Sequence, residues 1–380
     1  MVSHNMKSPV YILSDSVITP LGQTIAENMD KLYSKVSAVQ AESHEQMGTL
    51  YRSKFADTST FPTKNNSDSF TKIERLFIFS IEQAVSKLSF PIDLSQVLLV
   101  FASTKGNIEY LTDPDFDHNR LRIGFMANHI AAYFNNTIPS IVVSNACISG
   151  SQAIQYACQA LQNKKNTHVV VTGADCISEF VSSGFHSFQA LSPFACTPFD
   201  KKRAGVSLGE GCGTLILSTI PVSETNIEIC SVVSSNDANH LSGPSRTGEG
   251  LASAIAGAIK EAGIQSSEID VISAHGTATL YNDEMEALAF QTTGVSAAPV
   301  YSVKGNIGHT LGAAGIIETI YLAHSIQQDK LIPSIGFSES GTSIGLNIVT
   351  QATTKKIKIG LKTASGFGGG NTALILKKQK

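Results

Sequence analysis

The sequence predicts an α/β protein of layered architecture, built from two units or from one large paired fold. Short apolar runs rich in Val, Ile and Leu alternate with longer segments whose apolar residues recur every three or four positions. The chain of 380 residues is about two to three times the usual length of one domain. Only 16% of the residues are charged, against about 25% in typical soluble domains, so we expect extensive buried surface.

The apolar pattern assigns most elements. We expect strands at residues 10–13, 97–103, 138–143, 168–172, 213–217, 227–233, 269–274, 357–361 and 372–376. We expect helices at residues 71–88, 121–134, 148–162, 248–262, 283–291 and 311–327. In the first helix, Ile73, Leu76, Phe77 and Ile81 fall on one face, which predicts that this face is buried. Residues 41–68 are mostly polar and are predicted to form a surface loop.

An internal echo suggests two similar halves. Residues 211–217 (GCGTLIL) resemble residues 369–376 (GGNTALIL), with glycines leading into an apolar strand in both cases. Aligning Thr214 with Thr372 places Cys147 opposite Gly305, and both precede a predicted helix. Two halves joined near residues 221–226 would explain this echo. Chance similarity of two short strands is the alternative.

Composition excludes several classes of protein. The 28 Lys and Arg against 31 Asp and Glu give a net charge of −3, which argues against nucleic acid or an acidic membrane surface as a partner. No apolar run approaches the roughly 18 residues that a membrane helix needs, and the first residues lack the pattern of a signal peptide. The six cysteines form no CxxC pair, so neither a disulfide framework nor a metal site is expected. We expect a cytoplasmic protein.

Cys147 lies where a predicted strand turns abruptly into a helix. A thiol at a helix N-terminus feels the partial positive charge of unpaired N–H groups, so we expect a lowered thiol pKa. The small neighbours Ala146, Ser149 and Gly150 would let an acyl group and the backbone approach closely. A buried structural cysteine is the alternative.

His275 ends a predicted strand and opens a polar turn. Ligands of layered α/β folds lie beyond the carboxyl ends of strands, so this position suits a functional histidine. Thr277 and Thr279 offer hydroxyl groups to an amide-bearing ligand. A hydrogen-bonded core histidine is the alternative.

Two glycine-containing segments complete the set. Residues 303–309 (VKGNIGH) precede Glu318, with which Lys304 could pair across a helix start, and residues 312–315 (GAAG) permit close helix packing. Neither GxxxxGK[ST] nor GxGxxG is present here, which weakens the rival interpretation as a phosphate-binding loop. Residues 364–371 (ASGFGGGN) could cradle an oxyanion with backbone N–H groups, or could be a flexible hairpin connection.

In this order and spacing, the motifs resemble those of a known family. They are residues 145–150 (NACISG), 198–205 (PFDKKRAG), 209–211 (GEG), 275–279 (HGTAT) with Asp283 and Glu286, 304–309 (KGNIGH) and 366–369 (GFGG). The chain resembles the β-ketoacyl-[acyl-carrier-protein] synthases, decarboxylating condensing enzymes of the thiolase superfamily. The resemblance implies a thiolase-like, five-layered αβαβα fold of two pseudo-equivalent halves. Residues 1–224 would carry the nucleophile, and residues 225–380 would carry two catalytic histidines.

The resemblance also implies roles for single residues. Cys147 would accept the acyl group, and His275 and His309 would complete a Cys-His-His set. Lys304 with Glu318 would orient the second histidine and bias the site electrostatically.

The remaining roles concern the oxyanion and the carrier. The N–H groups of Cys147 and Phe367 would form the oxyanion hole, and Phe367 would gate the acyl pocket. Thr277 and Thr279 would contact the phosphopantetheine arm of the carrier protein.

The implied reaction is acyl transfer to Cys147 followed by decarboxylative condensation with malonyl-carrier protein to give 3-oxoacyl-carrier protein. It needs no metal and no diffusible cofactor, because the phosphopantetheine is carried by the acyl carrier protein. The implied partners are that carrier protein, its acyl and malonyl thioesters, and either a second copy or a related subunit. We expect basic docking residues for the carrier. The candidates are Lys201, Lys202 and Arg203, and also Lys355, Lys356 and Lys358.

Neighbouring branches of the superfamily differ at these residues. Degradative thiolases use a second cysteine in a C-terminal glycine loop, whereas the last cysteine here is Cys230. Starter-condensing relatives use Cys-His-Asn, whereas this chain has His309, and chain-length-factor partners lack the nucleophile. Residues 148–152 and 280–283 depart from the fatty-acid pattern, so elongation of fatty acids and of specialised polyene or polyketide chains both remain open. A non-catalytic accessory subunit and a Cys-His hydrolase are the competing hypotheses.

Overall fold

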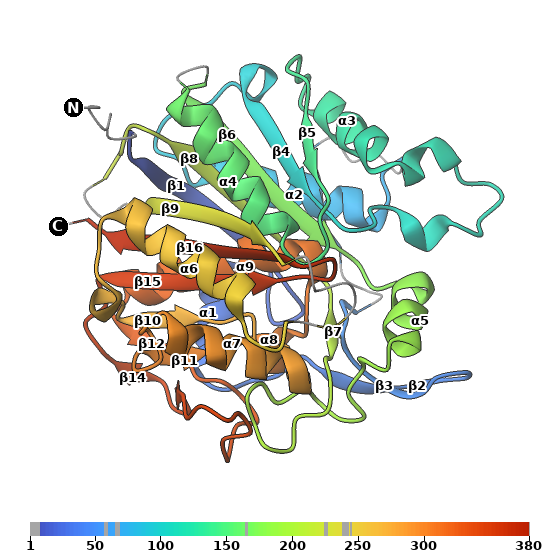
Figure 1. The fold of residues 1–380 in the computed structure, drawn as a ribbon. Coiled ribbons are helices and arrows are strands. Elements are labelled where there is room, and N and C mark those ends of the chain that lie inside the picture. The colour runs from blue at the N-terminus through green and yellow to red at the C-terminus, as the bar shows by residue number, and fades with distance from the viewer. Residues whose placement is uncertain are drawn as a thin grey trace.

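The computed structural model describes residues 8–56, 60–64, 69–163, 166–223, 227–237, 243 and 245–379. Within these ranges, one eleven-stranded sheet runs through the whole molecule (Figure 1). Its spatial order is β13 (Asn347–Ile348), β11 (Pro299–Tyr301), β10 (Val271–Ser273), β15 (Ile359–Ser365), β16 (Gly370–Lys378), β9 (Ile227–Asn236), β1 (Val10–Ile18), β8 (Gly211–Ser218), β6 (His168–Asp175), β4 (Leu98–Ala102) and β5 (Ile141–Val143). Small sheets are formed by β2 (Gln40–His44), β3 (Gly48–Ser53) and β7 (Leu208–Gly209), and by β12 (Lys330–Leu331) and β14 (Thr353–Thr354). The helices are α1 (Ile25–Tyr33), α2 (Lys72–Ser86), α3 (Ile123–Tyr133), α4 (Ser149–Gln162), α5 (Glu179–Ser187), α6 (Glu249–Ala262), α7 (Leu280–Thr292), α8 (Lys304–Ile307) and α9 (Ala314–Gln327).

The strand order divides the sheet between the two ends of the chain. Strands that precede residue 224 occupy one side, strands that follow residue 226 occupy the other, and β1 and β9 pair antiparallel where the two sides meet. The strands β8 and β16, which carry the internal echo, take the same place in each side: β8 lies between β1 and β6, and β16 between β9 and β15. The predicted boundary at residues 224 and 225 lies outside the described residues.

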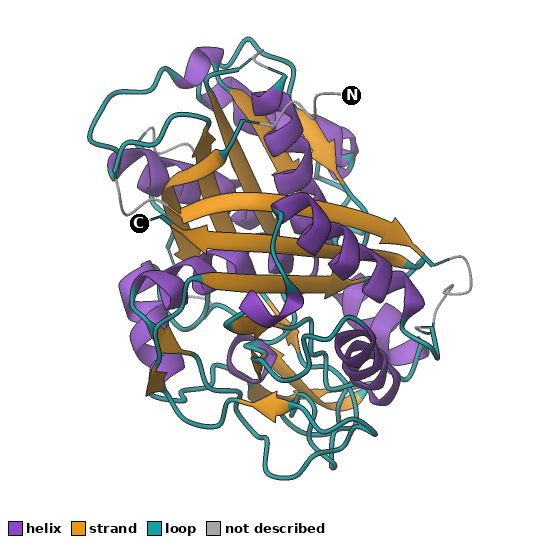
Figure 2. Ribbon diagram, turned by 60° about the vertical axis from the view of Figure 1, so that its left-hand side comes forward, coloured by secondary structure: helices purple, strands orange, loops and turns teal. Residues whose placement is uncertain are grey.

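The two sides of the sheet form two β layers, and helices lie between these layers and on both outer faces (Figure 2). The helices α4 and α9 contact each other and strands of both halves, so they form a central layer. The helices α2 and α3 cover the outer face of the N-terminal strands, and α6 with α7 covers that of the C-terminal strands. The predicted five-layered αβαβα fold is confirmed.

Alternation along the strands supplies the cores between these layers. In β6, Val169 and Val171 point into the central core with α4 and α9, whereas Val170 points into the outer core with α2. In β16, Leu374 joins the central core and Ile375 joins the core under α6. Both faces of these strands are buried, which is why their sequences read as continuous apolar runs.

The structure corrects one element prediction. Residues 40–53 form the hairpin of β2 and β3 rather than a loop, and β3 pairs in parallel with β7. The rest of the predicted loop falls partly on residues 57–59 and 65–68, which lie outside the described residues. In the described part of the chain, no helix is long and apolar enough to cross a membrane.

Candidate active site

Cys147 occupies a tight strand-to-helix turn between β5 and α4. The residue before it, Ala146, has a φ of +44°, a conformation that non-glycine residues rarely adopt and that concentrates at functional sites. The Ser149 hydroxyl holds this turn, because it accepts a hydrogen bond from Asn145 N–H (2.8 Å) and donates one to Ala146 O (2.6 Å). The thiol is therefore fixed at the entrance to α4, with 7% of the residue exposed.

The sequence suggested that Gly150 leaves space for an acyl group. In the structure, another helix occupies the space beside Gly150. A methyl group on Gly150 would lie 2.8 Å from Gly312 O and 2.9 Å from Ile316 N. Likewise, a methyl group on Gly315 would overlap Ser151 N. The predicted close packing of residues 312–315 is thus the crossing of α9 with α4.

His275 follows β10 at a turn held by two buried carboxylates. Glu286 of α7 accepts the N–H groups of His275 (2.7 Å) and Gly276 (2.6 Å), and Asp283 accepts that of Ala278 (3.2 Å). The lack of a side chain at Gly276 is required, because its φ is +45° and a methyl group there would lie 2.5 Å from Ser302 Cβ. The two acidic residues of the predicted motif therefore support the backbone that carries His275.

His309 lies on the loop that precedes α9. Its backbone pairs with the β7 region, since its N–H donates to Ser207 O (2.7 Å) and its O accepts from Gly209 N–H (2.9 Å). Its ring is 2% exposed, and neither ring nitrogen has a hydrogen-bond partner among the described residues. Buried polar atoms without a partner are uncommon, so these nitrogens are available to a substrate.

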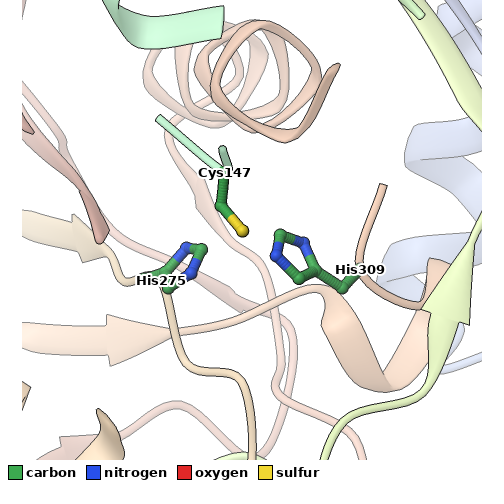
Figure 3. Close-up of side chains that lie close together, drawn as sticks. All are labelled: Cys147, His275 and His309. Atoms are coloured by element: carbon green, nitrogen blue, oxygen red, sulfur yellow. The ribbon is translucent and has the colours of Figure 1, made fainter. Parts of the chain in front are cut away.

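The structure brings the thiol and both imidazoles together from the two halves of the chain. Figure 3 shows the Cys147 sulfur directed between the two rings. The sulfur and one ring nitrogen from each of His275 and His309 lie within 4.8 Å of one another, and the ring centroids are 5.1 Å apart at an angle of 84°.

Three charged side chains lie buried behind this cluster. Lys304 Nζ lies 2.7 Å from Glu318 Oε1, as predicted, donates to His275 O and lies 3.4 Å from His275 Nδ1. Lys362 Nζ lies 2.7 Å from the other oxygen, Glu318 Oε2. Lys362 was not expected in the site; a lysine inside a strand that is otherwise apolar and leads to the glycine loop was the available signal.

Burial and these cations set the electrostatics. Burial, followed by the positive charge of Lys304 and Lys362, holds the pKa of both His275 and His309 well below the usual range, so both rings are neutral. Burial alone would raise the pKa of Glu318, but the two lysines hold it below its ordinary value, so Glu318 is ionised.

The expected lowering of the Cys147 pKa is wrong for the resting thiol. Burial raises the pKa of Cys147 to about 12, and the opposing effect of Lys304 does not compensate for it. Cys147 precedes the first residue of α4 by two positions, and the helix-terminal charge falls off within the first turn. A neighbouring base must therefore take the thiol proton during reaction, and the neutral imidazoles lie within reach.

A pocket of about 70 Å³ leads to the thiol. It is lined by Cys147, His275, Thr277, Thr279, Asn282, His309 and Phe367, together with Phe185, Ala190, Val206, Ser365 and Gly366. Thr277 and Thr279 lie on one wall, with their hydroxyl oxygens 2.9 Å apart. Phe367 packs between Phe185 and Phe188, with ring centroids 5.7 and 5.5 Å away.

The loop of residues 364–371 is an ordered hairpin connection between β15 and β16. Gly366 N–H donates to Gly370 O (2.9 Å), and Ser365 Oγ donates to Asn371 Oδ1 (2.7 Å). A methyl group on Gly366 would lie 3.2 Å from Cys147 N, so the Gly366–Phe367 turn lies directly beside the Cys147 amide.

The cluster is also a donor set of a type that Zn²⁺ accepts, with one thiol and two imidazoles. The Lys304 ammonium, however, faces His275 Nδ1, and a second buried lysine shares Glu318 behind it. This positive charge disfavours a cation at the three side chains.

Of the predicted docking residues, Arg203 is a structural residue. It is 6% exposed and donates to Gly341 O (2.6 Å), Asp200 O (3.1 Å) and Leu280 O (3.1 Å). Lys201 is exposed but lies 2.8 Å from Glu339. The prediction that Arg203 docks the carrier is therefore wrong, because this side chain is buried.

Comparison with known proteins adds independent evidence on the family. Residues 107–221 match the N-terminal domain, and residues 227–338 the C-terminal domain, of the β-ketoacyl synthase family. The 3-oxoacyl-[acyl-carrier-protein] synthase 2 of Staphylococcus aureus is 32% identical over 255 residues, which are 63% of this chain and 62% of that protein. A mitochondrial protein of Schizosaccharomyces pombe named as a 3-oxoacyl-[acyl-carrier-protein] synthase is 29% identical over 282 residues, which are 68% of this chain and 66% of that protein. The matches thus span less than two thirds of the length of these relatives.

The fold has a counterpart among solved structures as well. A chain from the complex of a ketosynthase with its chain length factor, from Xenorhabdus doucetiae, superimposes with a TM-score of 0.87 and 25% sequence identity over 100% of both chains. The two domain matches together cover more than half of the sequence and contain Cys147, His275 and His309. The chain belongs to the β-ketoacyl synthase family.

Proposed function

We propose that the protein is an acyltransferase, a 3-oxoacyl-[acyl-carrier-protein] synthase that elongates an acyl chain held on Cys147. The observation that carries the proposal is the convergence of one thiol and two neutral imidazoles on one pocket, with a glycine turn beside the thiol amide. Membership in the β-ketoacyl synthase family supports the reaction type.

The first step is transfer of the acyl group. His309, whose ring nitrogens are free, accepts the thiol proton as the Cys147 sulfur attacks the carbonyl carbon of the carrier thioester. The carbonyl oxygen becomes an oxyanion, which the N–H groups of Cys147 and Phe367 stabilise. The bond to the carrier sulfur then breaks, and that sulfur leaves with the proton from His309.

The second step is decarboxylation of the malonyl thioester. The bond between the malonyl carbon and its carboxylate breaks, and CO₂ leaves. The electron pair of that bond stays on the substrate and forms an enolate, whose oxygen needs hydrogen-bond donors. An ammonium group can only donate, so Lys304 close to His275 Nδ1 favours the tautomer in which Nε2 carries the proton. His275 Nε2–H and His309 are the donors to the enolate oxygen.

The third step joins the two units. The enolate carbon attacks the carbonyl carbon of the Cys147 thioester, and a carbon–carbon bond forms as the carbonyl oxygen becomes an oxyanion. The oxyanion then collapses, the carbon–sulfur bond breaks, and Cys147 leaves as a thiolate that takes up one proton from solvent. The product is 3-oxoacyl-carrier protein. These steps require neither a metal ion nor a diffusible cofactor, since the phosphopantetheine belongs to the carrier.

The pocket walls suggest how substrates enter. Thr277 and Thr279 offer two hydroxyl groups to the amides of the phosphopantetheine arm. Phe367, held between two aromatic rings, can turn away to admit an acyl chain. Both fatty-acid and specialised polyene or polyketide elongation fit these walls.

The proposed partners are an acyl carrier protein and either a second copy of this chain or a related subunit. The names of the curated relatives support the carrier, and the Xenorhabdus complex supports a related subunit as partner. A purely accessory role is disfavoured, because the chain keeps Cys147 together with both histidines in an assembled pocket. A hydrolase is disfavoured because thioester hydrolysis needs one base beside the thiol, whereas two imidazoles converge on Cys147 here.

Incubation with acyl- and malonyl-carrier protein, with products identified by mass spectrometry, tests the proposal. We expect a 3-oxoacyl product two carbons longer than the starter. Free fatty acid released without malonyl consumption would instead indicate a hydrolase. Activity that appears only with a second chain would indicate an obligate heterodimer.

A further inference from the structure

Lys362 is a buried cation that none of the proposed steps uses. It lies in β15 with no part of its side chain exposed. Its ammonium lies 2.7 Å from Glu318 Oε2 and 3.4 Å from Ser273 O, and it donates to Thr363 O. Burial lowers the pKa of Lys362, and the adjacent Glu318 carboxylate opposes this effect and favours the charged form.

Glu318 is consequently shared between two lysines. Oε1 lies 2.7 Å from Lys304 and Oε2 lies 2.7 Å from Lys362, with all three side chains almost fully buried. One negative and two positive charges leave a net charge of +1 behind the histidines. A single lysine would suffice to pair with Glu318, so the second one adds charge rather than pairing.

Two further carboxyl groups lie near the rings, and Glu286 interacts electrostatically with Lys362. From α7, Glu286 lies against His275, but its carboxylate accepts two backbone N–H groups and the Thr363 hydroxyl. Asp283, also from α7, accepts N–H groups of Phe199 and Ala278. Burial raises the pKa of both carboxyls, that of Asp283 to about 7. The groups that face His275 and His309 most directly are Cys147, Lys304 and each other.

This inference rests on the proposed function. We propose that Lys362 is a positioning residue of the condensing site, which shares Glu318 with Lys304 and so keeps a positive charge behind His275 and His309 that holds both rings neutral for acyl transfer to Cys147. A protonated imidazole could still donate to the enolate but could no longer accept the thiol proton. The extra charge thus extends the neutral form of both rings to lower pH.

The electrostatics agree with this role. The positive charges of Lys304 and Lys362 both contribute, after burial, to the lowered pKa of His275 and of His309. Removing one positive charge leaves a neutral lysine–glutamate pair and should raise the pKa of both rings.

The chain offers a matched pair of variants. Lys362→Met and Lys304→Met both leave one lysine paired with Glu318, but only Lys304→Met removes a side chain that touches His275. We expect Lys362→Met to shift the acid limb of acyl transfer to Cys147 upward by about one pH unit. Lys362→Arg, which keeps the charge, is expected to restore the wild-type profile. In Lys304→Met the rate should also fall at the pH optimum, because the contact with the ring is lost.

On the wild-type protein, a second measurement depends neither on activity nor on the folding of a variant. Proton NMR of histidine-labelled wild-type protein follows the ring protons of His275 and His309 with pH. We expect both rings to titrate well below the ordinary pKa of about 6.5. In Lys362→Met, their titration should move upward.

Two results overturn the inference: a ring that titrates near its ordinary pKa in the wild type, or a folded Lys362→Met protein with unchanged histidine titration. If the wild type neither accepts an acyl group nor releases CO₂ while the NMR result is as expected, the proposed function fails and the charge arrangement stands.

Discussion

Gly150 packs directly against Gly312, so closely that a methyl group on Gly150 would lie 2.8 Å from Gly312 O. Gly150 follows Cys147 by three residues, and Gly312 follows His309 by three. The crossing of α4 with the segment that leads into α9 therefore fixes the distance between the thiol of one half and the imidazole of the other. The two glycines, together with the buried hydrogen bond from Gly312 N–H to Asp175 Oδ2 (2.7 Å), bring the candidate catalytic groups together.

Gly150→Ala should consequently weaken both stability and activity. The added methyl group meets backbone atoms that cannot move aside, and overpacking of this kind costs about 1–3 kcal/mol. Chemical denaturation measures the loss of stability. Gly124→Ala in α3 is the control, since nothing lies within 4 Å of its added methyl group, and it should leave stability unchanged or raise it by up to about 1 kcal/mol. Equal stabilities of the two variants would contradict the packing argument.

Cys147→Ala should separate the two halves of the reaction. Without the sulfur no acyl-enzyme forms, so the mass increase on incubation with acyl-carrier protein should vanish, together with condensation. Release of CO₂ from malonyl-carrier protein should persist, because the donors to the enolate remain. Loss of both reactions in a folded variant would mean that the thiol takes part in decarboxylation itself.

His309→Ala should slow both half-reactions, because His309 accepts the thiol proton in acyl transfer and donates to the enolate in decarboxylation. Removing one preorganised donor to a developing oxyanion typically lowers the rate by about 100- to 1,000-fold. We expect a decrease of this size in kcat for decarboxylation, with a much smaller change in KM. An unaltered CO₂ release rate would assign the enolate to other donors.

The raised pKa of Cys147, about 12, predicts slow alkylation of the resting enzyme. The thiolate fraction falls tenfold for each pH unit below the pKa, so the rate of modification by iodoacetamide should rise about tenfold per unit between pH 7 and pH 9. Peptide mapping identifies the modified residue. A rate that is already constant across this range would mean a thiolate in the resting enzyme. Slow alkylation at neutral pH is thus expected of the active enzyme and is no sign of a non-catalytic accessory subunit.

The apolar elements could be predicted from the sequence because both faces of most strands are buried. Val169, Val170 and Val171 all lie in a core, and the long helix α2 carries its apolar residues at regular spacing. The hairpin of β2 and β3 was missed because β2 is polar and has no buried residue, while two of the three buried residues of β3, Arg52 and Ser53, are polar. Pairing with β7 adds to the burial of β3 in holding the hairpin in place.

The candidate site was recognised through its motifs, but its electrostatics depend on depth, which a sequence does not reveal. Cys147 was expected to be acidic from its place before a helix, yet burial dominates and raises its pKa. Lys362 directly follows the predicted strand at residues 357–361 and belongs to none of the motifs. Only the fold shows that its ammonium reaches the same carboxylate as Lys304, which comes from a distant segment.

A single-turnover experiment tests the central claim most directly: enzyme loaded with an acyl group on Cys147 is mixed with malonyl-carrier protein labelled with ¹³C at its free carboxyl group. Intact-protein mass spectrometry follows the acyl-enzyme while labelled CO₂ and the carrier product are quantified. The account predicts that loss of the acyl group from Cys147, release of labelled CO₂ and appearance of 3-oxoacyl-carrier protein occur in equal amounts. An acyl group that stays on Cys147, or leaves as free acid while no labelled CO₂ is released, would contradict it.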